Sequence, residues 1–109
     1  MIELSLDKAF KSLADPTRRE VLKLLSEAPT ALSISTIVDH FTGSRQAITK
    51  HLNVLNQANL IEFEQRGRER FCSPNYTPLK EVNQWIQSYE QYWSYRIELL
   101  DKYTQTSGG

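Results

Sequence analysis

Apolar residues recur three and four positions apart at the start of the chain, which is the spacing of an amphipathic helix. A first helix is predicted over about residues 4–14, with an apolar face formed by Leu6, Phe10 and Leu13. Asp15-Pro16 ends this helix and begins the next one, because Asp caps helix N-termini and Pro fits the first helical position. The second helix ends near Ala28-Pro29.

Two shorter helices follow, separated by a tight turn. Ser33 can cap a helix that runs to Phe41, and Ser44 can cap another that closes at Asn59. The turn between them is Thr42-Gly43-Ser44. Two helices joined by such a turn form a helix-turn-helix, in which the second helix enters the major groove of DNA.

The rest of the pattern predicts a hairpin and one long helix. Apolar and acidic residues alternate over residues 61–64, and a turn at Arg66-Gly67 leads into a return strand around residues 70–73. Thr77-Pro78 opens the last helix, which runs to about residue 103 before a polar tail that we expect to fray.

These elements predict a single domain over residues 1–109 that is mainly α with a small β-hairpin. The expected architecture is a winged helix-turn-helix of about five helices and a two-stranded wing, with a terminal dimerisation helix over about residues 78–103. No internal repeat and no long linker divides the chain.

The second helix of the motif has one apolar and one polar face. Ile48, Leu52 and Leu55 form the stripe that we expect to be buried. Opposite lie residues of the types that contact base edges or phosphates, and with the cap residue they form the predicted DNA-binding set: Ser44, Arg45, Gln46, Thr49, Lys50 and Asn53.

Within this set, the residues nearest the start of the helix are predicted to contact bases, namely Arg45, Gln46 and Thr49. Lys50 suits bases or phosphates. A merely solvated face would look the same in isolation, but the preceding turn and the adjoining basic hairpin favour DNA. His51 points toward the Leu52 side, which favours a packing or hydrogen-bonding role.

The predicted wing carries three arginines around a glycine turn, Arg66, Arg68 and Arg70, partly offset by Glu69. Such residues can simply keep an edge strand soluble, but beside a recognition helix they favour contact with phosphates or the minor groove. The formal net charge is zero, yet no acidic residue lies between Asp39 and Glu62. Because steering depends on the local field, a locally basic surface still predicts salt-sensitive DNA binding.

The last helix carries apolar residues on a seven-residue repeat, more than a domain of this size can cover alone. We expect it to pair with a second copy, with the first helix packed alongside. The predicted dimer interface is Leu6, Phe10, Val82, Ile86, Tyr89, Trp93 and Leu100. Two alternatives remain: an ordinary intramolecular core, or a pocket for an apolar effector. A twofold dimer implies a near-palindromic operator.

The composition is that of a globular protein, with no apolar run near the roughly 20 residues that a membrane span needs. The start of the chain has no pattern of a secretory signal. Cys72 is the one cysteine, and the strand beside it favours a small packing residue over a redox sensor. A cytoplasmic location is expected.

Three motifs in this order resemble those of ArsR/SmtB-type winged-helix repressors, over about residues 6–103. They are Ala14-Asp15-Pro16-Thr17-Arg18-Arg19, Thr49-Lys50-His51-Leu52 and Ala58-Asn59-Leu60-Ile61. The resemblance implies a bacterial or archaeal homodimer that represses transcription and releases DNA on a signal. Trp85-Ile86-Gln87-Ser88-Tyr89 and Tyr92-Trp93 resemble a branch of the family that does not sense metals.

The chain departs from the metal-sensing members of that family. Sensors of arsenic, cadmium or lead carry a cysteine pair where Ser33 and Ser35 stand here, and neutral hydroxyls are poor ligands for soft metals. Zinc and nickel sensors use histidines and carboxylates on the terminal helix, and this chain has no histidine beyond His51. We therefore predict no metal site and no cofactor.

The function predicted from these observations is a dimeric, sequence-specific transcriptional regulator, most simply a repressor. Its expected partners are double-stranded DNA and a second copy of itself, with no membrane contact, and the sequence identifies no small-molecule effector. The alternative is a winged-helix module that binds protein without reading DNA. An enzyme is disfavoured because the chain has no glycine-rich phosphate loop and no cluster of metal ligands.

Overall fold

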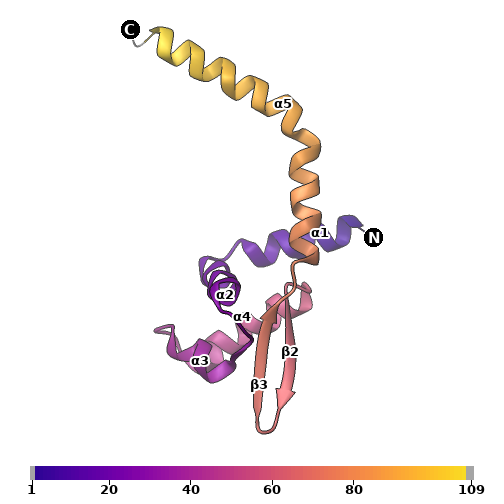
Figure 1. Ribbon diagram of the computed structural model, residues 1–109, viewed down its shortest axis with the longest axis vertical. Helices are drawn as coiled ribbons and strands as arrows, with labels where there is room; N and C mark the ends of the chain where they lie inside the picture. The colour runs from indigo at the N-terminus through magenta and orange to yellow at the C-terminus, as the bar shows by residue number, and fades with distance from the viewer. Residues whose placement is uncertain (1, 108–109) are drawn as a thin grey trace.

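The computed structural model describes residues 2–107 of the 109, and it is mainly helical with a small antiparallel sheet (Figure 1). The predicted winged helix-turn-helix of five helices is confirmed. In chain order the elements are α1 (Ile2–Leu13), α2 (Pro16–Glu27), β1 (Leu32–Ser33), α3 (Ile34–Asp39), α4 (Arg45–Gln57), β2 (Ile61–Arg66), β3 (Glu69–Pro74) and α5 (Thr77–Ser107).

The predicted helix caps are present. The side chains of Asp15, Ser33 and Ser44 accept hydrogen bonds from backbone N–H groups in the first turns of α2, α3 and α4. Asn59, just after α4, has a φ of 60°, the left-handed conformation that Asn tolerates after a helix. These local interactions explain why the helix boundaries follow the polar residues at each turn.

The core lies between α2, α3, α4 and the base of the sheet. The expected stripe of α4 is buried, with Ile48, Leu52 and Leu55 between 0% and 2% exposed. Burial of these side chains fixes which face of α4 remains in solvent. The other buried members of the core are Val21, Leu22, Leu25, Ile34, Ile37, Ala58, Leu60, Ile61 and Cys72.

The predicted two-stranded wing is confirmed as β2 and β3, and a third strand that was not predicted, β1, joins them in the order β1-β3-β2. β1 pairs with β3 through Leu32 opposite Cys72 and Ser33 opposite Phe71. β1 has only two residues, which is too short for an alternating pattern, so the sequence does not predict this strand. The hairpin itself turns at Gly67-Arg68, one residue later than predicted, and Gly67 has the positive φ of 63° that a two-residue turn requires.

α5 begins against α1, then extends away from the rest of the molecule (Figure 1). The helix continues to Ser107, so the predicted end near residue 103 was wrong, and the last two residues of the predicted tail, 108–109, lie outside the described residues. Polar residues alone do not end a helix, and no glycine or proline occurs between Pro78 and Gly108. Within residues 2–107, no helix has both the length and the apolar content that crossing a lipid bilayer requires.

Candidate nucleic-acid interface

The polar face of α4 presents five neighbouring side chains to one shallow surface concavity. They are Arg45, Gln46, Thr49, Lys50 and Asn53, and none of them is acidic. All are exposed except Thr49, which is half-buried. The structure thus brings together on one face all the predicted readers of α4, while Ser44 is engaged as the helix cap.

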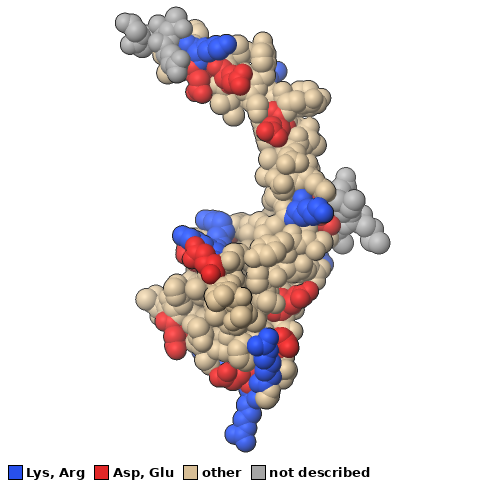
Figure 2. Space-filling view, viewed as in Figure 1, with Lys and Arg blue, Asp and Glu red and all other residues tan. Residues whose placement is uncertain are grey.

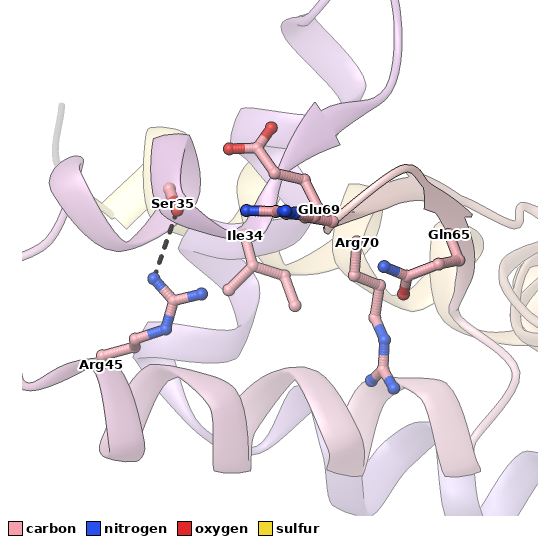
Figure 3. Close-up of a pocket in the computed structure, with 7 residues that line it drawn as sticks. Ile34, Ser35, Arg45, Gln65, Glu69 and Arg70 are labelled. Carbon is pink, nitrogen blue, oxygen red and sulfur yellow. Dashed lines mark hydrogen bonds between the residues drawn. The ribbon is translucent and has the colours of Figure 1, made fainter.

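Arg45 turns from the start of α4 toward α3. Its Nη1 donates a hydrogen bond to Ser35 Oγ at 3.2 Å (Figure 3). This places its guanidinium at a cleft of about 270 Å³ between the helix-turn-helix and the hairpin. The cleft is lined by Ile34, Ser35, Arg45, Gln65, Arg68, Glu69 and Arg70.

The cleft also contains Gln65, which the sequence analysis did not single out. Gln65 pairs across the hairpin with Arg70, so both side chains lie on the inner face that looks toward α3 and α4 (Figure 3). The two-residue period of β2 could have revealed it, because Gln65 follows Ile61 and Phe63 at alternate positions.

Two of the three wing arginines are held on aromatic rings. The Arg66 guanidinium lies 4.6 Å from the centre of the Phe71 ring, and that of Arg70 lies 4.7 Å from the centre of the Phe63 ring. Arg66 also donates to Glu64 at 2.9 Å, and this hydrogen bond together with the Arg66 charge holds the pKa of Glu64 below its usual value.

Arg68 is at the tip of the hairpin, where Figure 2 shows Lys and Arg side chains protruding from the lower end of the molecule. No hydrogen bond or ion pair joins Arg68 to another described side chain. The wing therefore presents two arginines that contact aromatic rings and, at its tip, Arg68, which also lines the cleft.

His51 has the hydrogen-bonding role that its position predicts. Its Nδ1 lies 3.2 Å from Nη1 of Arg18 and 3.9 Å from Oδ1 of Asp15. The side chain is therefore directed toward α2 and away from the polar face of α4.

Cys72 is confirmed as a small packing residue at the base of β3. The residue is fully buried, and this burial raises the pKa of its thiol to about 11, although the Arg70 charge opposes the shift. At neutral pH the thiol is protonated and lacks the nucleophilic form.

The hydroxyls at the two positions of the metal-sensing cysteines serve the fold. Ser33 Oγ caps α3, and Ser35 Oγ accepts from Arg45. Among the residues that the structure describes, no three His, Cys, Asp or Glu side chains gather where a metal ion could be held.

The apolar residues predicted for a dimer interface have different exposures. Val82 is half-buried, while Phe10, Ile86, Tyr89, Trp93 and Leu100 are 38%, 41%, 46%, 40% and 64% exposed. Leu6 is only 9% exposed, so its own chain already covers most of this side chain and little of it is left for a second chain to contact. Consecutive aromatic contacts connect Phe10, Trp85, Tyr89 and Trp93, with ring centres 5.2 to 6.2 Å apart.

Residues 13–62 match the model of a family described as a helix-turn-helix domain. The chain is 35% identical over 81 residues to the transcriptional repressor SdpR of Bacillus subtilis. The aligned region covers 74% of this chain and 88% of SdpR.

Two solved structures extend the comparison to the fold. An ArsR family transcriptional regulator, RHA00566, superimposes with a TM-score of 0.76 at 29% identity, covering 84% of this chain and 93% of that one. A homodimeric winged helix-turn-helix domain of Mycobacterium bovis, Mb0332, has the same fold at 16% identity, with a TM-score of 0.63 and coverage of 80% and 81%.

Proposed function

Because the chain belongs to the ArsR-type family of winged helix-turn-helix transcriptional regulators, we propose that it binds DNA as a homodimer through α4 and the β2–β3 wing. The chain is a DNA-binding transcriptional regulator and not an enzyme. The alternative of a winged helix that binds only protein is set aside. As SdpR is a repressor, we infer that this chain also represses transcription, acting in the cytoplasm.

The observation that carries the proposal is the polar face of α4. Five side chains without a carboxylate lie directly opposite a fully buried stripe, so this face is fixed outward and has the chemistry of a DNA-reading surface. We assign base contacts in the major groove to Gln46, Thr49 and Asn53. Lys50, next to them, suits a phosphate.

The cleft beside α4 supports a different role for Arg45 from the one that the sequence favoured. Its hydrogen bond to Ser35 turns the guanidinium toward α3, at the cleft that Gln65 and Arg70 of the wing also line. In the proposed complex, α4 lies in the major groove and the wing lies beside the neighbouring minor groove. The DNA strand between these two grooves then passes between α4 and the wing. We therefore assign Arg45 and Arg70 to phosphate contacts, and Arg68, at the tip of the hairpin, to the minor groove.

The homodimer is supported by the surface of α5. Ile86, Trp93 and Leu100 expose large apolar side chains along a helix that extends beyond its own domain. Burying the exposed part of these side chains removes further apolar surface from water, which favours pairing with a second α5. Phe10 continues this surface onto α1 through its contact with Trp85.

Two glutamine variants on the same helix test the proposed reader. Gln46→Ala should relax base preference at one or two positions of the binding site, by about 1–3 kcal/mol of discrimination. Gln57→Ala is the matched control, because Gln57 is exposed on α4 but lies outside the polar face. Binding is measured by fluorescence anisotropy on a set of single-base variants of the selected site. Equal base preference in both variants would refute the assignment of Gln46.

A further inference from the structure

Arg18, near the start of α2, uses all three guanidinium nitrogens to join other helices. Nε donates to the carbonyl oxygen of Ser12 at 2.6 Å, and Nη2 donates to that of Lys11 at 3.1 Å. Both carbonyls belong to the last turn of α1, and that of Lys11 also accepts from the N–H of Ala14 at 3.3 Å. Nη1 lies 3.2 Å from Nδ1 of His51, in the middle of α4. One side chain thus connects three helices.

The chemistry of the pair fixes which atom donates. A guanidinium is charged throughout the accessible pH range and has no acceptor, so Nδ1 of His51 accepts from Arg18 and the ring proton is on Nε2. Asp15 also faces this site, with Oδ1 at 3.9 Å from the same Nδ1. That carboxylate is already engaged as the cap of α2, accepting from the N–H groups of Thr17 and Arg18.

The hydrogen bond between Arg18 and His51 differs in kind from the other contacts that hold α4 in place. Among the described residues it is the one side-chain hydrogen bond between α4 and α2, and the two helices otherwise pack through apolar residues. Apolar packing has little directional preference, whereas a hydrogen bond weakens steeply when its angle departs from linearity. The Arg18–His51 hydrogen bond therefore adds a directional constraint on the rotation of α4 to the one that burial of its apolar stripe already imposes.

The Arg18–His51 hydrogen bond lies between the proposed dimer interface and the proposed DNA-reading face of α4. α1 packs against α5, so the end of α1 moves with the proposed dimer interface, whereas His51 moves with the reading face of α4. In a twofold dimer, the distance and angle between the two copies of α4 depend on how each is held relative to its own α1. That distance must match the separation of two half-sites, about 34–36 Å.

We propose that Arg18 and His51 form a junction that positions the recognition helix relative to the dimerisation helices, and so sets the half-site spacing that the dimer accepts. Arg18 and His51 are positioning residues, since neither belongs to the polar face of α4. This inference rests on the proposed dimeric DNA binding, and it adds a specificity determinant outside the DNA contacts.

Two substitutions of His51 separate positioning from packing. His51→Asn keeps an acceptor near the position of Nδ1, whereas His51→Leu keeps bulk and removes the acceptor. Arg18→Lys keeps the charge but cannot bridge three partners with one nitrogen. Each variant is titrated with the selected operator and with operators whose half-sites are moved together or apart by one base pair. Thermal unfolding of each variant reports any general loss of stability.

The wild-type protein and His51→Asn should prefer the natural spacing. His51→Leu and Arg18→Lys should lose about tenfold of that preference, within the range of coupling between contacting residues. Nitroxide labels at Gln57 in the two chains of the DNA-free dimer should give one narrow distance distribution in the wild type and a broader one in His51→Leu.

The possible results are distinct. If His51→Leu lowers stability but leaves both the spacing preference and the label distances unchanged, the junction is only structural and the inference is wrong. If a variant loses the same amount of affinity for operators of every half-site spacing, the inference is also wrong. If the nitroxide labels in the wild-type protein show no dipolar coupling, the proposed dimer does not form. The proposed function is then wrong in this respect, and so is this inference.

Discussion

The globular part of the molecule and the outer half of α5 carry the same apolar spacing but use it differently. In α4, Ile48, Leu52 and Leu55 recur at helical spacing and are buried within the chain. In α5, Trp93 and Leu100 recur in the same way and remain exposed, along a helix that extends the molecule to 62 Å. Periodicity thus identifies an apolar face, and only the tertiary structure shows whether the chain covers that face itself.

The polar faces of the two helices differ as well. The outward face of α4 has no carboxylate, whereas α5 carries Glu90, Glu98 and Asp101 among its exposed residues. A surface with these acids would repel DNA phosphates. The two helices therefore divide the work that we propose: α4 contacts DNA, and α5 contacts a second chain.

The largest expected effect comes from matched leucine substitutions on the two helices. Leu52→Ala removes a fully buried side chain and should lower the free energy of unfolding by about 2–5 kcal/mol. Leu100→Ala should leave the unfolding of dilute, monomeric protein within about 0.5 kcal/mol of the wild type. Urea titrations at low protein concentration measure both. Similar losses in the two variants would mean that α5 is part of the monomer core.

A charge on the exposed stripe of α5 should separate the chains. Trp93→Asp is expected to weaken the dimer by about 2 kcal/mol or more, roughly 30-fold in its dissociation constant. Tyr95→Asp is the control, because Tyr95 is more exposed and lies off the repeat. Sedimentation equilibrium should report monomers for the first variant and dimers for the second. A Trp93→Asp protein that remains dimeric would place the interface elsewhere.

A lysine on the reading face should act through phosphate charge. Lys50→Ala should weaken binding by a similar factor on every DNA sequence and lower the slope of log K against log salt by about one. Lys23→Ala, an exposed lysine on α2, should change neither quantity. A loss confined to particular base pairs would make Lys50 a base reader instead.

The smallest expected effect concerns the cap of α2. Burial alone would raise the pKa of Asp15, but hydrogen bonds from the Arg18 and Thr17 N–H groups outweigh it, so the pKa lies below its ordinary value of 3.8. The carboxylate therefore stabilises the fold above that ordinary value, and the contribution is lost as the pH falls through the lowered pKa.

Asp15→Asn keeps a capping side chain and removes this proton linkage. Its stability should fall less steeply in acid than that of the wild type, as followed by helical circular dichroism. If the two proteins lose stability with the same dependence on pH, Asp15 contributes no proton linkage.

Much of the fold and of the interface could be predicted from the sequence, because the information is local. Asp15, Ser33 and Ser44 mark their helix starts, and the stripe through Ile48 fixes the face of α4 that remains in solvent and that we propose reads DNA. β1 could not be predicted, since its pairing with β3 depends on residues almost 40 positions apart.

Other features depend on tertiary contacts that no spacing reveals. The burial of Leu6, the turn of Arg45 toward Ser35 and the junction of Arg18 with His51 each depend on how separate helices meet. The end of α5 differs from the prediction for a local reason: polar residues alone do not end a helix, and no glycine or proline lies between Pro78 and Gly108.

Selection of DNA from a random pool by the purified wild-type protein, followed by sequencing, tests the central claim most directly. A dimer that presents two copies of α4 should enrich an inverted repeat, with half-site centres about 10–10.5 base pairs or a multiple of that apart. Enrichment of a single unrepeated site, or of no site at all, would contradict a paired reading surface built on α4 and α5.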